Sequence, residues 1–461
     1  MKRMKTYGPS VAKSSYDTSG LNAYGSGAPP QWLNALPTVL PETLITPVPA
    51  KTPQLTRMEK RLQPQETNYA SNGNNILTFD FPNAKPIDFR EGYLTFDVIL
   101  TTTQVVPPDQ HYQRFSQGIY SCLNKVRVIF GSMEDEIQYY NRLYSHIWNS
   151  SVDNEVEATM GVDLIGIGTQ AQRNAAGAST TGTKYVVPML YGMFRQGTLP
   201  MNALSTGTNG QLLRVELTLE NPLLCVETNG LNPQYQFVNL RWHYSEVSSE
   251  DGSYEREMVK MVQSGNYKIG FETWSVYQNP VLNSAVDVIV QWKGAAINYI
   301  ASTLVDASTQ ADTLVNDKFT TWLKTLSNGA SLLNYQHSVN EIWIPVEAVD
   351  TAGQAQRAFM MYLNNHGYWS IDGRNAFPAP IDIQTFNVNQ FIITLNLRSY
   401  CRKYIDRAEF FNNLSTSTST SNTLLRMQFT AAPPPQTVVY HFVSNNNLLV
   451  ASPNGILTKK W

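Results

Sequence analysis

The sequence predicts an all-β protein: two consecutive eight-stranded antiparallel jelly rolls (a double jelly roll), with short helices in loops and an N-terminal arm. From about residue 75, short runs of β-branched and aromatic residues alternate with polar residues. These runs fall into two sets of about eight, separated by one charged, helix-like stretch. Neither set shows the helix after nearly every strand that a parallel α/β protein requires.

The charge content indicates a protein that is buried against other subunits. The 461 residues carry 34 basic and 36 acidic side chains, which gives a net charge of −2, and only 15% of the residues are charged. A general nucleic-acid binder needs a basic surplus to displace counterions, and a charge-rich disordered chain needs more charge than this. A surface poor in charge suits subunit contacts, because removing an unpaired charge from water is costly.

The cysteines and the apolar runs indicate where the chain folds. Cys122, Cys225 and Cys401 are too few for a disulfide framework and have no metal-ligand spacing, so we interpret them as small buried hydrophobic side chains. No apolar region follows the basic start, and no run of ~18 apolar residues occurs. We therefore expect no secretion signal, no transmembrane helix and a reducing compartment.

Residues 1–70 differ from the rest and are predicted to form an N-terminal arm. They are rich in proline and glycine and have no sustained periodicity, so they cannot build a core. Apolar side chains such as Trp32, Leu36 and Leu40 are embedded in this segment. We expect an arm that orders against a partner subunit, an internal membrane or the genome; the alternative is a solvated tail.

Residues 71–248 are expected to form the first jelly roll. Alternating apolar and polar residues predict strands at 76–81, 93–100, 126–130, 136–139, 185–189, 212–219 and 237–244. One amphipathic helix is predicted at 140–148, where Leu143, Tyr144 and Ile147 fall on neighbouring turns. Residues 249–266 are predicted to be a connector that is helical over 254–262, with Ser253 as its N-cap.

Residues 267–445 are expected to form the second jelly roll, followed by a C-terminal tail at 446–461. Strands are predicted at 267–277, 285–292, 296–301, 341–346, 390–397, 424–430 and 438–443. Helices are predicted at 312–326 and 352–363. Pro345 lies inside a strand and predicts an edge position, because proline cannot donate to a central ladder.

No arrangement of residues in the sequence points to catalysis. The six histidines, which lie at positions 111, 146, 243, 337, 366 and 441, have no metal-ligand spacing, and the glycine cluster at 161–168 lacks the lysine of a phosphate loop. The acidic run 134–136 is interpreted as a solvated turn. We expect no enzyme activity, no catalytic, cofactor-binding or metal-binding residues, and no cofactor or small-molecule substrate.

Two passages are similar to a known family. Residues 197–220 contain GTLPMNAL and then LLRVELTLE, which resembles the "LP-x-x-x-L … LRIELTL" passage of double jelly-roll major capsid proteins of eukaryotic dsDNA viruses. Residues 137–148, IQYYNRLYSHIW, are similar to the "YN-x-L" helix of that family. The nearest types are polinton-like viruses, virophages and small amoebal viruses.

The resemblance implies a structural protein of the virion. It implies homotrimeric, pseudo-hexameric capsomers that tile an icosahedral viral shell. The implied partners are neighbouring capsomers, penton and minor capsid proteins, with assembly in the host cell.

Two other functions remain open. A receptor- or carbohydrate-binding β-sandwich, as in a penton or spike protein, could use Trp369 with Tyr368 and Asp372 as a sugar platform. A β-rich hydrolase would have to use Asp372 and His366.

Overall fold

The computed structural model describes residues 55–460 except 67–68, 72, 74, 132, 152–156, 190–191, 196–197, 205–211, 266, 292–295, 340, 354, 367–380 and 398–422. All the described residues belong to one compact unit, Pro37–Trp461.

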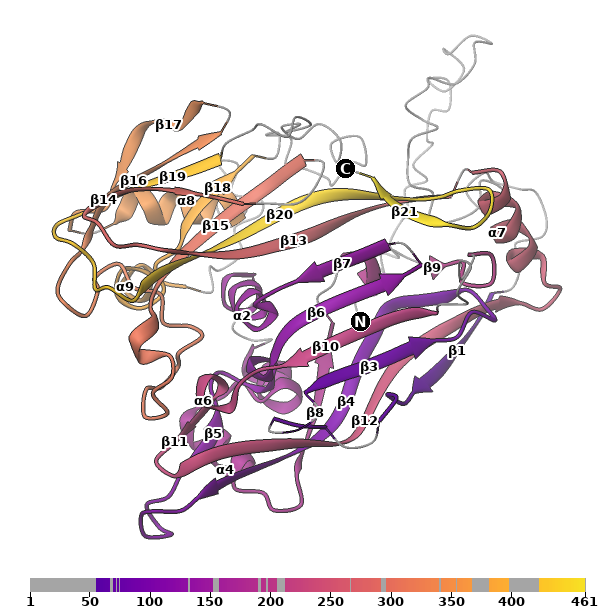
Figure 1. The fold of residues 1–461 in the computed structure, drawn as a ribbon, viewed down its shortest axis with the longest axis horizontal. Coiled ribbons are helices and arrows are strands. Elements are labelled where there is room, and N and C mark those ends of the chain that lie inside the picture. The colour runs from indigo at the N-terminus through magenta and orange to yellow at the C-terminus, as the bar shows by residue number, and fades with distance from the viewer. Residues whose placement is uncertain are drawn as a thin grey trace, which may run out of the picture. The chain divides into compact units, whose positions relative to one another are not determined.

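The first half of the described chain contains two antiparallel sheets that share a core (Figure 1). In one sheet the spatial order is β1 (Leu55–Leu62), β12 (Leu231–Ser249), β4 (Ile87–Thr103) and β8 (Thr183–Pro188). In the other it is β3 (Ile76–Phe81), β10 (Leu213–Leu219), β6 (Leu123–Phe130) and β7 (Met133–Ile137). The short strands β2 (Tyr69–Ala70) and β9 (Thr198–Leu199) extend the first sheet, and β5 (Gln113–Phe115) pairs with β11 (Val226–Thr228).

The second half repeats this arrangement. One sheet has the order β13 (Lys268–Pro280), β20 (Thr437–Ala451), β15 (Ala296–Asp306) and β18 (Ile393–Asn396), and β21 (Leu457–Lys460) also pairs with β20. The other has the order β14 (Ala285–Ile289), β19 (Thr423–Phe429), β16 (Leu332–Val339) and β17 (Ile342–Asp350).

The strand order identifies each half as a jelly roll. When the four-strand paths are renumbered along the described chain, the first half reads 1-8-3-6 in one sheet and 2-7-4-5 in the other. The second half gives the same two orders. Two packed sheets with nested Greek-key connections define the jelly roll, so the predicted fold class of two consecutive rolls is confirmed.

Period-two burial explains why these segments form sandwich strands. On the central strand β10, Leu213, Val215 and Leu217 are buried, whereas Arg214 and Glu216 lie on the outer face. The alternation places one apolar row against the facing sheet and leaves charged residues outside.

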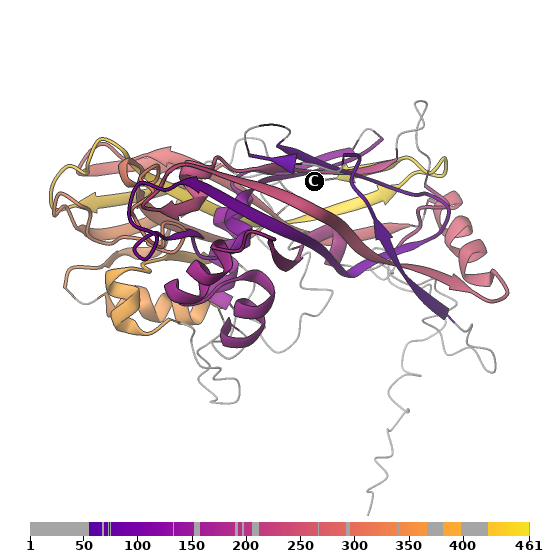
Figure 2. The ribbon, with the colours of Figure 1, turned by 90° about the horizontal axis from the view of Figure 1, so that it is seen from below.

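The helices occupy the connections between strands. They are α2 (Tyr140–Ser151), α4 (Gln170–Gly177), α5 (Gly192–Arg195), α6 (Pro222–Cys225), α7 (Ser253–Gln263), α8 (Gln356–His366) and α9 (Ile383–Val388), with η3 (Ile119–Cys122), η4 (Glu157–Ile165) and η5 (Ala307–Thr309). In Figure 2 the magenta helices of the first roll and the orange helices of the second lie on one side of the strands. The hydroxyl of Tyr362 in α8 donates to the carbonyl of Ser150 in α2 at 3.4 Å, which joins the two groups.

The predicted helices at 140–148, 254–262 and 352–363 are confirmed, but the predicted cap of the connector helix is wrong. Gly252, with φ of 66°, is the N-cap residue of α7 and makes no side-chain capping bond. The hydroxyl of Ser249 accepts from the N–H of Tyr254 at 3.0 Å instead.

The predicted helix at 312–326 is also wrong. Within this segment the structure has turns and isolated bridges, because its backbone groups bond to other parts of the molecule. The Trp322 N–H donates to the carbonyl of Asn389 at 2.6 Å, and the Leu323 N–H donates to that of Leu304 at 3.0 Å. A helix would need these groups for its own i to i−4 bonds.

Two predicted boundaries are wrong for the same reason: sheet pairing extends beyond them. Strand β1 lies inside the predicted arm, and all of its residues pair with β12. Strands β20 and β21 run into the predicted tail and pair over 448–451. Pro345 lies on β17, the last strand of its sheet, so the predicted edge position is confirmed.

Candidate functional site

Two of the cysteines considered in the sequence lie side by side in the structure. Cys122 and Cys225 are both buried and form no disulfide. Burial raises the pKa of Cys122, and the neighbouring Cys225 thiol raises it further. Cys401 and the platform residues at 368, 369 and 372 lie outside the described residues. Among the residues that the structure describes, no three His, Cys, Asp or Glu side chains are grouped to hold a metal ion.

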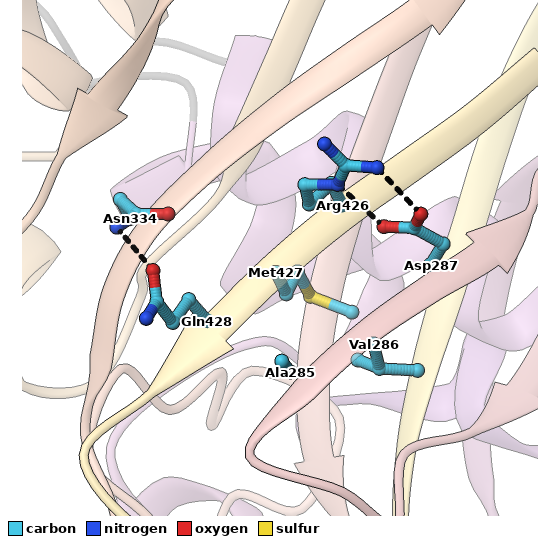
Figure 3. A pocket seen from close by; sticks show the side chains of 7 residues that line it. All are labelled: Ala285, Val286, Asp287, Asn334, Arg426, Met427 and Gln428. Carbon is cyan, nitrogen blue, oxygen red and sulfur yellow. Dashed lines mark hydrogen bonds and ion pairs between the residues drawn. The ribbon is translucent and has the colours of Figure 1, made fainter.

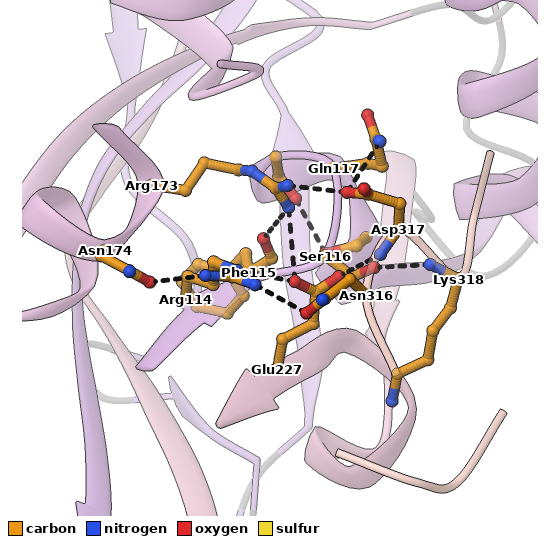
Figure 4. A network of polar contacts seen from close by, with 12 residues as sticks. Arg114, Phe115, Ser116, Gln117, Arg173, Asn174, Glu227, Asn316, Asp317 and Lys318 are labelled. Carbon is orange, nitrogen blue, oxygen red and sulfur yellow. Dashed lines mark hydrogen bonds and ion pairs between the residues drawn. The ribbon is translucent and has the colours of Figure 1, made fainter. Parts of the chain in front are cut away.

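A buried network of polar contacts, the junction, joins the two rolls (Figure 4). At its centre, Glu227 of β11 is completely buried. It accepts from Arg114 Nε at 2.7 Å and lies 3.7 Å from a guanidinium nitrogen of Arg173. From the second roll, the Asp317 N–H donates to Glu227 at 2.6 Å. A buried carboxylate is stable only when it is paired and hydrogen-bonded in this way.

The two arginines extend the junction into the second roll. Arg114 donates to the side-chain oxygens of Asn174 at 2.9 Å and Asn316 at 2.6 Å. Arg173 donates to Asp317 at 2.7 Å, and Gln117 donates to the same carboxylate oxygen at 3.0 Å. The planar guanidinium fork lets one side chain hold several acceptors at fixed angles.

The backbone is held in unusual conformations at the same place. Gln117 and Asp317 have φ of 61° and 55°, values that only a few per cent of non-glycine residues adopt. Gly118, which follows Gln117, has φ of 107°, and a Cβ there would come within 2.8 Å of Ile167. The surrounding hydrogen bonds fix these conformations, and so fix how the loop meets the second roll.

Helix α2 forms the second part of the junction. Arg142 is buried, donates to the carbonyl of Lys318 at 2.8 Å and hydrogen-bonds Gln310. Its guanidinium lies 4.0 Å from the ring centre of Phe319. Ser145, one turn further on, donates to the Phe319 carbonyl at 2.9 Å. The first roll therefore holds three consecutive residues of the second, 317–319, through their backbone.

Burial changes the acid–base behaviour of the junction cations. Lys318 donates its ammonium group to the carbonyls of Leu223 at 3.0 Å and Gln310 at 3.1 Å. Burial, partly offset by the charge of Glu227, lowers the pKa of Lys318 to about 8. Burial also lowers the pKa of Arg142. These two cations donate to carbonyls across the boundary between the rolls, so they hold the two rolls together.

A second contact between the rolls involves the acidic run 134–136, which the sequence analysis interprets as a solvated turn. That interpretation is wrong, because residues 134–136 lie on β7 and Asp135 is buried. Its carboxylate accepts from Lys459 of β21 at 2.5 Å and from Thr273 of β13 at 3.3 Å. Close by, Gly192 of α5 meets β13 so tightly that a Cβ would lie 1.5 Å from the Glu272 carbonyl oxygen.

The outer face of the second roll carries a shallow groove of about 400 Å³ (Figure 3). Strands β14, β16 and β19 line it. Asp287 accepts two hydrogen bonds from Arg426, both at 2.8 Å, and Asn334 donates to Gln428 at 3.0 Å. Since these polar groups pair with one another, the groove presents few groups for a ligand.

Sequence reasoning missed the junction. Arg114 and Glu227 are 113 positions apart, and neither forms a motif with its neighbours. The available signal was weak: single charged residues within otherwise apolar strand ends.

No helix among the described residues is long and apolar enough to cross a membrane.

The fold is similar to three solved capsid structures, although no protein-family model and no curated protein matches the sequence. A quasi-atomic model of the PBCV-1 virus capsid aligns with a TM-score of 0.57 at 10% identity, covering 90% of this chain and 98% of that chain. The Sputnik virophage structure aligns at 0.53 and 11% identity, covering 90% of each chain. The Faustovirus major capsid protein aligns at 0.52 and 10% identity, covering 89% of this chain and 92% of that chain. At these identities the likeness shows the double jelly-roll fold.

Proposed function

We propose that this chain is the major capsid protein of an icosahedral virus. The observation that carries the proposal is the same eight-strand order in both halves, within a chain that covers 98% of a PBCV-1 capsid chain. The charge-poor composition supports it, because a shell subunit buries much of its surface against neighbours.

The duplicated fold supports trimeric capsomers. Three chains with two similar rolls each present six similar corners around one axis, which is a pseudo-hexameric outline. Such a unit tiles an icosahedral shell if the two rolls keep a fixed relative orientation. The junction around Glu227 and the Asp135–Lys459 pair supply that rigidity through buried bonds.

Further partners belong to the same proposal. They are neighbouring capsomers, penton proteins and minor capsid proteins in the virion. The segment before β1 contacts an internal membrane, the genome or a neighbouring subunit. The chain is assembled in the host cell, uses no cofactor or small-molecule substrate, and has a structural and not an enzymatic role.

Light scattering after size exclusion tests the proposal. The full chain is expected to elute as a trimer, three times 51.8 kDa, and to form closed shells or sheets visible by electron microscopy at high concentration. A stable monomer that never assembles would overturn it. A glycan array without a hit, together with stable shell formation, would remove the receptor- or carbohydrate-binding alternative.

A further inference from the structure

The edge strand β17 contains a large bulge. Its partner β16 pairs Tyr335 with Val349 and His337 with Ile344, so residues 345–348 of β17 stand opposite Gln336 alone. Bulges of this kind turn an edge strand away from its sheet and redirect its side chains.

Side chains from two other elements hold the bulge in place. The two N–H groups of the Gln336 amide and the guanidinium of Arg357 in α8 together engage four consecutive backbone carbonyls. Gln336 donates to Pro345 at 2.8 Å and Val346 at 2.9 Å, and Arg357 donates to Ala348 at 3.1 Å and Glu347 at 3.5 Å. The bulge is therefore preorganised.

The bulge exposes an apolar side chain, Val346, to solvent. Val346 is 89% exposed, more than any other large hydrophobic side chain in the described ranges, and Ile342 on the same strand is 65% exposed. A rigid, projecting hydrophobic group loses little conformational entropy when it is buried by a partner. An edge strand with such side chains is a template for contact with another chain.

The charge on β17 selects the partner. The strand carries Glu347 and Asp350 and no basic residue, and Glu341 precedes it. Two cations lie beside the strand. Arg357 donates to the carbonyls of the bulge, and Arg426, whose guanidinium is 4.2 Å from the ring centre of Trp343, is paired with Asp287. The complementary surface should be an exposed edge strand with basic and apolar side chains.

Strand β1 of the first roll has these properties. It is the terminal strand of its sheet, and most of its residues are exposed. It carries Arg57, Lys60 and Arg61 against a single acid, Glu59, and exposes Met58 to 48%. Arg57 and Lys60 pair with acids of their own subunit, whereas Arg61 makes no ion pair with another described residue.

We propose that β1 of one subunit docks against the β17 bulge of a second copy of this chain, with Met58 near Val346 and Arg61 near Glu347. The inference rests on the proposed function and names the surfaces that make the capsomer. The contact joins a first roll to a second roll, so it is heterologous, and repeating it about an axis closes a ring. Opposite charges set the register of the two edges and disfavour contacts between like edges.

Cysteine cross-linking tests the contact directly. The variant carrying both Met58→Cys and Val346→Cys is oxidised with copper phenanthroline as a purified trimer and run on a denaturing gel without reductant. We expect covalent dimers and trimers from the double variant only. The unmodified chain and each single variant are the controls, and a covalent dimer from Val346→Cys alone would show a symmetric contact and overturn the proposal.

Charge reversal gives an independent measurement. Glu347→Lys and Arg61→Glu are each expected to weaken trimer association by about tenfold, and the double reversal is expected to restore it. Additive losses in the double variant would overturn the pairing.

The outcomes separate this inference from the proposed function. Trimers by light scattering without the cross-linked ladder would reject these surfaces and leave the capsid proposal in place. A monomeric parent chain would reject both.

Discussion

The buried carboxylate of Glu227 depends on its partners for its stability. Glu227 is enclosed between two arginines and a backbone N–H. Removal of its charge leaves Arg114 buried without a counter-ion, whereas Arg173 keeps its ion pair with Asp317. Breaking a buried pair costs far more than the pair contributes when intact, because the remaining charge is desolvated.

We predict that Glu227→Gln lowers the free energy of unfolding by about 3 kcal/mol. Glu216→Gln is the matched control: it also removes a carboxylate bonded to an arginine, Arg127 at 3.3 Å, but at a partly exposed site, where about 0.5 kcal/mol is expected. Urea denaturation of both variants checks this, and equal losses would contradict it.

Two buried histidines make the second roll sensitive to acid. His337 on β16 and His441 on β20 come from facing sheets, and both are fully buried. Neither nitrogen of His337 has a hydrogen-bond partner among the described residues, and His441 bonds only Ser302, at 2.8 Å. Burial lowers the pKa of each to about 3; for His441, the charge of His337 lowers it further.

The sign of the resulting pH dependence follows from linkage. Above pH 6.5 the two histidines are neutral in both the folded and the unfolded chain. Below pH 6.5 they take up protons in the unfolded chain, whereas in the folded chain they remain neutral down to about pH 3. Stability therefore falls from pH 6.5 downward, by about 2 kcal/mol per histidine at pH 5. The double variant His337→Leu with His441→Leu should flatten this dependence in thermal melts, whereas His111→Gln should not.

At the scale of elements, strand β21 links the two rolls. It pairs with β20, its Leu457 is buried, and its Lys459 forms an ion pair with Asp135 of the first roll. A strand of four residues contributes little by its own hydrogen bonds, so its importance lies in the charge that it brings to a buried carboxylate.

We predict that truncation after Ala451 costs about 3–5 kcal/mol in the free energy of unfolding. Lys459→Met isolates the charge, because the methionine keeps the apolar stem. Adding Asp135→Asn to Lys459→Met should recover part of the loss, since no buried charge then remains. Failure of the double variant to recover any stability would show that the charge is not the cause.

Strand β1 sets the limit for deletions at the N-terminus. Removal of residues 1–54 keeps β1 and should leave soluble trimers that form shells poorly. Removal of residues 1–62 takes away β1 and uncovers the edge of β12, which should cause aggregation. Size exclusion and electron microscopy separate the two outcomes, and normal shells from the shorter deletion would exclude a role for the arm.

At the scale of the whole molecule, the two rolls are expected to unfold as one unit. Contacts around Glu227, Arg142 and Asp135 cross between them and are buried, so either roll alone would expose paired charges and apolar surface. Calorimetry of the capsomer should show a single transition. Gly192→Ala, which forces α5 away from β13, should lower the Tm of that transition without splitting it; two separate transitions would contradict this view.

The sequence by itself determined the fold class, most strands and three helices. This is because apolar residues recur every second position in a strand and every 3.6 positions in a helix when one face of the segment packs against a core. The tertiary structure alone decided the rest. Strand β1 is mostly exposed and is held by backbone pairing with β12. Since neither of its faces is buried in a core, its sequence LTRMEKRL does not alternate between apolar and polar residues. Residues 312–326 have a helical pattern but give their backbone groups to distant partners. The Glu227 junction brings together side chains more than a hundred positions apart, and no local pattern encodes such a contact.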